Sequence, residues 1–205
     1  FNGDTQLVGL WAQDTWKIAP KWKAVLGARA ERWSARNGET SNASVALNHP
    51  ERSENHVSPK AAVAYQASEL WVLKASTGRA VRMPTVAELY QGGISGSGTL
   101  INNDPHLRPE KSWTTELTAE RDLSGWGGEG LLRLTAFFER TKDALYSQTN
   151  VLVTPNITNV QNVDEMRTKG LELSYQAANV SVRGLDIGSS LTWTDSRITR
   201  NDKFP

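Results

Sequence analysis

Four residues between positions 79 and 110 could together bind an anionic ligand. Arg79 and Arg82 carry guanidinium groups, which stay charged and offer fixed N–H donors to oxygen atoms. Tyr90 adds a phenol and His106 an imidazole, a common metal ligand. We therefore predict these residues as contacts for an anionic metal chelate. In the competing interpretation, which we favour for Arg82 and Tyr90, the residues of this segment stabilise the loop and the protein wall instead.

The sequence does not predict an enzyme, a cofactor or a resident metal. It contains neither the HExxH nor the GxSxG motif, and its carboxylates are scattered. The chain has no cysteine, which excludes thiolate sites and disulfides. The remaining histidines, His49 and His56, are interpreted as solvated loop residues.

Composition excludes one class of partner and suggests another. The net charge is +1 and no stripe of Lys and Arg with interleaved aromatics occurs, so nucleic acid is not expected. The chain has eight Trp against four Tyr and four Phe. Trp is favoured at membrane interfaces, although it also fills the cores of soluble β proteins. The mean hydropathy of −0.49 does not decide between them, because transmembrane barrels also contain many polar residues.

Apolar residues recur with a period of two, which predicts β-strands with one apolar and one polar face. In the segment 22–33, for example, Leu26 and the even-numbered alanines share one face, and Lys23 and Arg29 share the other. About eight main strands are predicted in all. They cover residues 7–17, 22–33, 57–66, 70–78, 112–121, 131–141, 170–175 and 185–194.

The predicted connections alternate between short and long. The short ones are residues 19–21, 67–69, 124–128 and 177–183, and the long ones are Ser34–His56, Arg79–Glu110 and Lys142–Thr168. Outer-membrane barrels have short periplasmic turns and long extracellular loops, and their strands need about 9–11 residues to cross the bilayer. This pattern favours an antiparallel up-and-down transmembrane barrel over a soluble antiparallel fold.

Several motifs resemble, in order and spacing, the barrel of TonB-dependent outer-membrane receptors. They are Gly9–Trp16 ("GLWAQDTW"), Gly27-Ala28-Arg29, Ser58-Pro59-Lys60, Arg82-Met83-Pro84 running to Glu88-Leu89-Tyr90, Asn103 to Glu110, and Gly170-Leu171-Glu172. The resemblance implies that Pro84, Glu88, Asn103, Pro109, Glu110, Gly170 and Glu172 are family motif residues, which we expect to be structural.

The resemblance implies that residues 1–205 are part of a 22-stranded β-barrel in the outer membrane of a Gram-negative bacterium. We expect the plug domain and the C-terminal strands to be absent from this segment. The parent protein would contact outer-membrane lipid and would take energy from the TonB complex through the missing N-terminal part.

A ferric siderophore is the expected substrate, because it is the commonest in the family. Haem, cobalamin or another metal chelate is the alternative within the family, and a soluble structural or adhesion β protein is the alternative outside it. Haem is disfavoured because no His lies between Tyr90 and Asn103, and Val81 stands where haem receptors usually show Phe.

The tryptophans are expected to form two bands. Trp16 and Trp22 flank the short turn at Pro20 and should mark the periplasmic interface. Trp33 and Trp193 lie at the far ends of their strands and should mark the outer interface.

Overall fold

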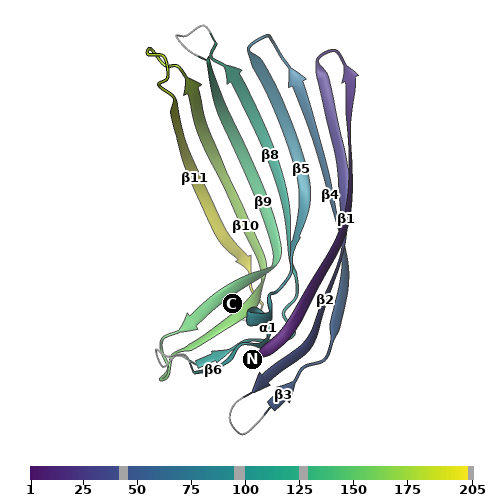
Figure 1. Cartoon of the computed structure of the whole chain (residues 1–205). Helices are drawn as coiled ribbons and strands as arrows, with labels where there is room; N and C mark the ends of the chain where they lie inside the picture. The colour runs from purple at the N-terminus through teal and green to yellow at the C-terminus, as the bar shows by residue number, and fades with distance from the viewer. Residues whose placement is uncertain (42–45, 95–99, 125–128, 203–205) are drawn as a thin grey trace.

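The chain folds into one curved antiparallel sheet (Figure 1). This computed structural model describes residues 1–41, 46–94, 100–124 and 129–202. Eight long strands make up most of the described sheet, in agreement with the predicted number. They are β1 (Asn2–Ala19), β2 (Trp22–Ser41), β4 (Arg52–Gln66), β5 (Trp71–Arg82), β8 (Glu110–Asp122), β9 (Glu129–Asn150), β10 (Ile157–Ala178) and β11 (Ile187–Arg200).

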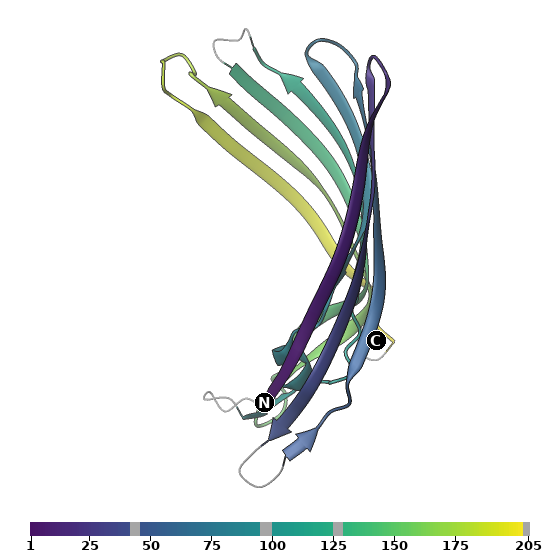
Figure 2. The same ribbon diagram turned by 45° about the vertical axis from the view of Figure 1, so that its right-hand side comes forward.

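The long strands lie side by side in chain order, each antiparallel to the next. Three short strands, β3 (Ala46–Asn48), β6 (Gly92–Ile94) and β7 (Leu100–Asn102), add to one end of the sheet. Figure 2 shows that the sheet bends into a trough. The connections predicted to be short gather at one end of this trough, and the three segments predicted as long loops lie at the other. We call these the turn end and the far end.

Strand register shows that one face of the sheet is apolar across neighbouring strands in its middle part. Residues directly opposite each other in an antiparallel pair point to the same face. One row crosses five neighbouring strands through Leu73, Ala119, Leu134, Leu173 and Leu191. Leu191 is 71% exposed. An apolar surface of this extent requires an apolar environment, so this face is the lipid-facing one.

The opposite face is polar. The adjacent register row crosses the same five strands through Lys74, Thr118, Thr135, Glu172 and Thr192. Thr118 and Thr135 are hydrogen bonded through their hydroxyls at 3.0 Å. In a barrel this second face lines the water-filled interior, and we call it the lumenal face.

Two of the predicted long loops are largely strand. β2 continues to Ser41 and β4 begins at Arg52, so most of Ser34–His56 is paired. β9 and β10 likewise pair from Asn150 with Ile157 through most of Lys142–Thr168. The prediction was wrong because hairpins that extend beyond the lipid carry polar residues on both faces, so the apolar alternation stops while the backbone ladder continues. Residues 42–45 of the first loop and residues 125–128 of one short turn lie outside the described residues.

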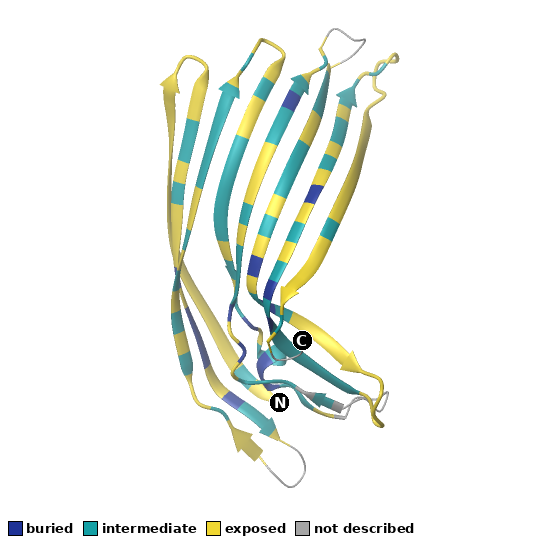
Figure 3. Cartoon of the chain, turned by 180° about the vertical axis from the view of Figure 1, so that it is seen from behind, coloured by how far each residue is buried: buried dark blue, intermediate teal, exposed yellow. Residues whose placement is uncertain are grey.

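A small core lies at the far end, on the lumenal side. Its buried residues are Trp33, Ala35, Leu89, Tyr90 and Leu107. Figure 3 shows buried residues gathered around the single described helix, α1 (Val86–Tyr90). No helix among the described residues is long and apolar enough to cross a membrane.

The predicted tryptophan bands are confirmed at one end only. Trp16 and Trp22 lie beside the β1–β2 turn on the lipid-facing side, each 43% exposed, and Trp22 packs on Tyr65 with ring centroids 4.5 Å apart. Trp33 lies toward the other end of the same hairpin, as predicted, but points to the lumenal face and is 1% exposed. Its assignment to an outer interface band was wrong. Trp193 is 58% exposed and pairs with Leu171 in the middle of the β10–β11 ladder.

Candidate functional site

Helix α1 forms where strand β5 ends. Pro84 cannot donate a ladder hydrogen bond and therefore stops the strand. Thr85 then caps the helix: its hydroxyl accepts from the Glu88 backbone N–H at 3.3 Å, and the Glu88 carboxylate accepts from the Thr85 N–H at 2.9 Å. This capping box satisfies donors that a five-residue helix otherwise leaves free.

Arg82 is bound to Glu88. Its Nη2 donates to Oε1 of Glu88 at 2.5 Å, which fastens the first turn of α1 to the end of β5. Burial, the largest influence, acts to raise the pKa of Glu88. The hydrogen bonds from the Thr85 backbone, Arg82 and the Thr85 hydroxyl outweigh it, so the pKa lies below the ordinary value of 4.5. The ion pair fits the structural interpretation of Arg82, and its predicted ligand contact is untested.

Asn103 connects α1 to the barrel wall. Its side-chain amide donates to the Ala87 carbonyl at 2.9 Å, and its carbonyl oxygen accepts from the Val160 N–H of β10 at 3.0 Å. One side chain therefore satisfies a helix carbonyl and a strand amide that are far apart in sequence.

Tyr90 packs against the backbone of the β1–β2 hairpin. A methyl group built on Gly38 would lie 2.4 Å from the Tyr90 ring, and one on Gly3 would lie 2.8 Å from it, so only glycine allows this approach. The Thr40 hydroxyl donates to the Tyr90 carbonyl at 2.8 Å. The residue is 2% exposed. Tyr90 is therefore part of the far-end core, and its predicted ligand contact is untested.

Glu110 and Pro109 hold the start of β8. The Glu110 carboxylate accepts from the Leu145 N–H at 2.9 Å, and this bond ties β8 to β9. Pro109 is fully buried, as is Pro84. A structural role for these motif residues stays a prediction.

Gly170 provides space for an aromatic ring on the lumenal face. A methyl group there would meet the Trp193 carbonyl at 2.3 Å and the Phe137 ring at 2.4 Å. Glu172 follows on the same face, opposite Thr135 and Thr192. The Gly-x-Glu motif therefore combines a packing position with a lumenal carboxylate.

Arg79 lies at the seam where β5 separates from β4. Its register partner on β8 is Trp113, and its Nη1 donates to the Val57 carbonyl at 3.2 Å. By register, Arg79 belongs to the lipid-facing row. The structure therefore does not bring it together with Arg82, Tyr90 and His106.

His106 is the most accessible of the predicted contacts. Its side chain is 72% exposed, and Nδ1 lies 3.3 Å from Oδ1 of Asp104. It borders a depression of about 350 Å³ at the far end. The other lining residues are Asp104, Arg108, Asn162, Asp164 and Asp202, and with His106 we call them the rim cluster.

Arg108 is the cation of the rim cluster. Its Nη2 lies 2.9 Å from Asp143 and 3.7 Å from Asp164, and its side chain is 56% exposed. Asn162 supports the same segment by accepting from the Arg108 N–H at 2.7 Å. Within the described ranges, no group of three or more His, Cys, Asp and Glu is arranged to hold a metal ion.

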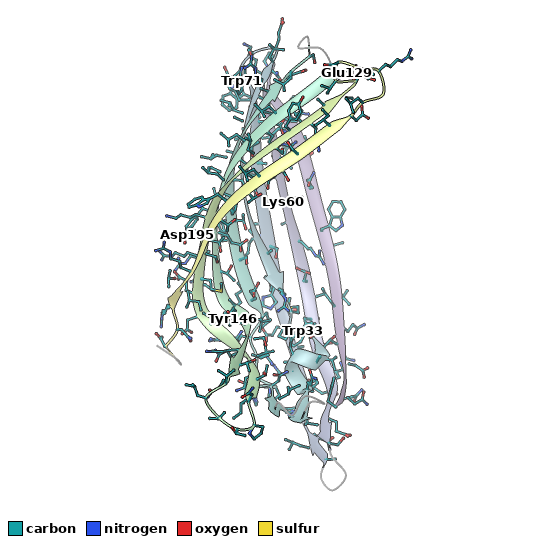
Figure 4. The ribbon with its side chains drawn as sticks, turned by 90° about the vertical axis from the view of Figure 1, so that its left-hand side faces the viewer. Trp33, Lys60, Trp71, Glu129, Tyr146 and Asp195 are labelled. Atoms are coloured by element: carbon teal, nitrogen blue, oxygen red, sulfur yellow. The ribbon has the colours of Figure 1, made fainter. Side chains whose placement is uncertain are left out.

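Figure 4 shows the two ends of the wall. Trp71 and Glu129 lie at the turn end, whereas Trp33 and Tyr146 lie toward the far end. Tyr146 lines a second depression that also includes Arg200 and one residue of the rim cluster, Asp202. Sequence reasoning missed Arg108 and Asn162, because only the hydrogen bonds between the segment that precedes β8 and strand β10 bring them together. It also missed α1, although Thr85-Val86-Ala87-Glu88 is a capping-box pattern.

Comparison with known proteins gives consistent results. The family model for the TonB dependent receptor-like β-barrel matches residues 1–205. A probable TonB-dependent siderophore receptor, PiuA of Acinetobacter baumannii, is 24% identical over 203 residues, which are 99% of this chain and 25% of that protein. The chain thus spans a quarter of the length of this curated relative.

Solved structures show the same fold. The Serratia marcescens hemophore receptor HasR, in complex with its hemophore and heme, matches with a TM-score of 0.74 and 18% identity over 95% of this chain and 34% of that one. The copper transporter OprC matches with a TM-score of 0.72 and 18% identity over 96% and 30%. Sheet order, face alternation and the whole-length family match agree, and the chain belongs to the TonB-dependent receptors, the β-barrel proteins of the Gram-negative outer membrane.

Proposed function

We propose that this chain is a part of the barrel wall of an importer that takes up a ferric siderophore with energy from TonB. The observation that carries the proposal is the whole-length match to the receptor barrel family, together with a relative described as a siderophore receptor. The plug domain, the TonB contact and the closing strands of a 22-stranded barrel belong to the parent protein in this proposal.

The rim cluster is the part of this segment that would meet the ligand. Ligand arrives from outside the cell, and the far end carries the long connections that reach outward. Arg108 offers fixed N–H donors to the anionic oxygens of a ferric chelate, and His106 stands beside it with 72% of its side chain exposed. Arg82 is the second candidate: carboxylates hold both guanidinium groups, Glu88 that of Arg82 and Asp143 with Asp164 that of Arg108, and the Arg82 side chain is 49% exposed against 56% for Arg108.

Haem is the second candidate substrate. The exposed imidazole of His106 favours it, since imidazole is a haem iron ligand. The two substrates make different demands on the rim: a ferric siderophore uses the charge of Arg108, whereas haem uses the imidazole nitrogen.

Binding to the purified full receptor tests both candidates. The probes are a ferric hydroxamate, a ferric catecholate and haem. Arg108→Gln should weaken binding of the cognate ferric chelate by about tenfold or more, as expected for a lost charge-assisted hydrogen bond. Arg108→Lys should restore part of it. Lys21→Gln removes one cation from the β1–β2 turn and is the matched control.

Three outcomes decide the proposal. Weaker binding of the ferric chelate to Arg108→Gln, with unchanged binding to Lys21→Gln, supports siderophore uptake. If the receptor binds haem selectively and His106→Ala abolishes this binding, haem uptake replaces siderophore uptake as the function. A folded receptor that binds neither ferric chelate nor haem contradicts both.

A further inference from the structure

The lipid-facing side of the sheet becomes cationic over a short distance. Five basic residues follow the apolar face toward the far end on three neighbouring strands. They are Arg140 and Lys142 of β9, Arg167 and Lys169 of β10, and Arg197 of β11, and we call them the cationic band. Register places Arg140 opposite Arg167 and Arg167 opposite Arg197, so these three point to one face.

The transition from apolar to basic is abrupt on each strand. On β10, Leu171 is followed on the same face by Lys169 and then Arg167; on β9, Phe138 is followed by Arg140. From Tyr175, near the turn end, to Arg167 is about 27 Å along the strand, or roughly 20 Å of height after tilting. That is close to the height of about 25 Å expected for the apolar belt of such barrels. The cationic band therefore lies at the outer boundary of the lipid.

Anions within the band do not balance its charge. Glu165 accepts from Arg140 and Arg167, and Asp195 accepts from Arg197 and lies 3.9 Å from Lys169. Lys142 is exposed and has no ion-pair partner among the described residues. Five cations thus face two carboxylates, a net charge of +3.

The basic side chains remain accessible. The exposed fractions are 44% for Arg140, 52% for Arg167, 63% for Lys169 and 75% for Arg197. Glu165 and Asp195 are mostly buried beneath them, at 11% and 22%. The carboxylates therefore orient the guanidinium groups, and each guanidinium keeps donors for an external acceptor.

We propose that the cationic band binds the phosphate groups of a glycolipid headgroup in the outer leaflet of the outer membrane. Guanidinium and ammonium groups match phosphate in charge and donor geometry. The apolar face immediately below, with Leu171, Phe138 and Trp193 exposed, would contact the acyl chains of the same lipid. This inference concerns the lipid around the barrel and does not depend on the imported substrate.

The test is lipid binding to the full receptor in detergent. The probes are lipopolysaccharide and the same lipid after enzymatic dephosphorylation. The variant K142Q/K169Q/R197Q removes three cations and leaves Glu165 with its partners Arg140 and Arg167. The matched control K17Q/K23Q/K60Q removes three cations from the lumenal face. Heat-modifiable gel mobility verifies folding of each.

The band variant should bind the phosphorylated lipid more weakly by on the order of fivefold per removed cation, and the difference should shrink in high salt. Dephosphorylated lipid should bind wild type and band variant alike, and the lumenal control should match wild type. Arg197→Lys should retain most of the affinity. Equal affinity of band variant and wild type for the phosphorylated lipid overturns the proposal. An equal loss of affinity of the band variant for the phosphorylated and the dephosphorylated lipid also overturns it, because the basic residues would then not contact phosphate.

Discussion

Substitution of Leu117 by Arg tests whether the apolar face of the sheet contacts lipid in the middle of the wall. Leu117 is 61% exposed and pairs with Ala75 and Ala136 on the apolar face. It lies four residues from Arg121 at the turn end and four from Trp113 at the other, about 14 Å along the strand in each direction. Arginine near the bilayer midplane costs about 2–4 kcal/mol. Because the side chain is already exposed, little packing energy is lost in addition.

Thr118→Arg is the matched control. Thr118 is the next residue on β8 but points to the lumenal face, beside Lys74 and Thr135. The assay is the fraction of full receptor that folds from urea into lipid vesicles, followed by heat-modifiable gel mobility. The expected change of 2–4 kcal/mol corresponds to roughly 30- to 900-fold in the folding equilibrium. Equal behaviour of the two variants would refute the assignment of faces.

Three further predictions concern the far end and the β10–β11 ladder. Trp33→Ala should destabilise the packing of α1 by about 3–5 kcal/mol, because the ring is 1% exposed against Leu89, and proteolysis of the α1 segment should accelerate. The pKa of Glu88 is lower in the folded state than its ordinary value of 4.5. The ionised carboxylate should therefore contribute fully to the free energy of unfolding above pH 4.5, and this contribution should disappear as the pH falls through the pKa of the folded state. Glu88→Gln should remove that dependence in acid unfolding of the receptor. Gly170→Ala should cost about 1–3 kcal/mol by displacing the Trp193 carbonyl and the Phe137 ring, and unchanged unfolding would show that neither contact restricts this position.

The strands could be predicted from the sequence wherever one face of the sheet contacts lipid. Between Leu26 and Ala30, or Leu171 and Tyr175, one apolar and one polar environment impose a period of two, and that period is visible without coordinates. Beyond the lipid both environments are aqueous. The paired residues Gln148 and Asn159 therefore carry no signal that distinguishes a strand from a loop.

The candidate site was less predictable. Arg82 and Glu88 are close in sequence, and their partnership follows from the helix start. The partners of Asn103 and Arg108 come from β10, more than fifty residues away, and only the strand register brings them close. Trp33 shows the same limit: period two already places it on the polar face with Lys23 and Arg29, whereas its burial depends on the packing of α1 against it.

Cysteine accessibility along β8 tests the central claim most directly. This segment contains no cysteine, so single substitutions at residues 114–119 can be compared without background from it. The label is a membrane-impermeant maleimide applied to the folded full receptor in lipid vesicles. The account predicts that Thr114, Glu116 and Thr118 react, since they face the aqueous lumen, and that Thr115, Leu117 and Ala119 do not. Uniform labelling of all six positions, or labelling of the odd-numbered set alone, would contradict it.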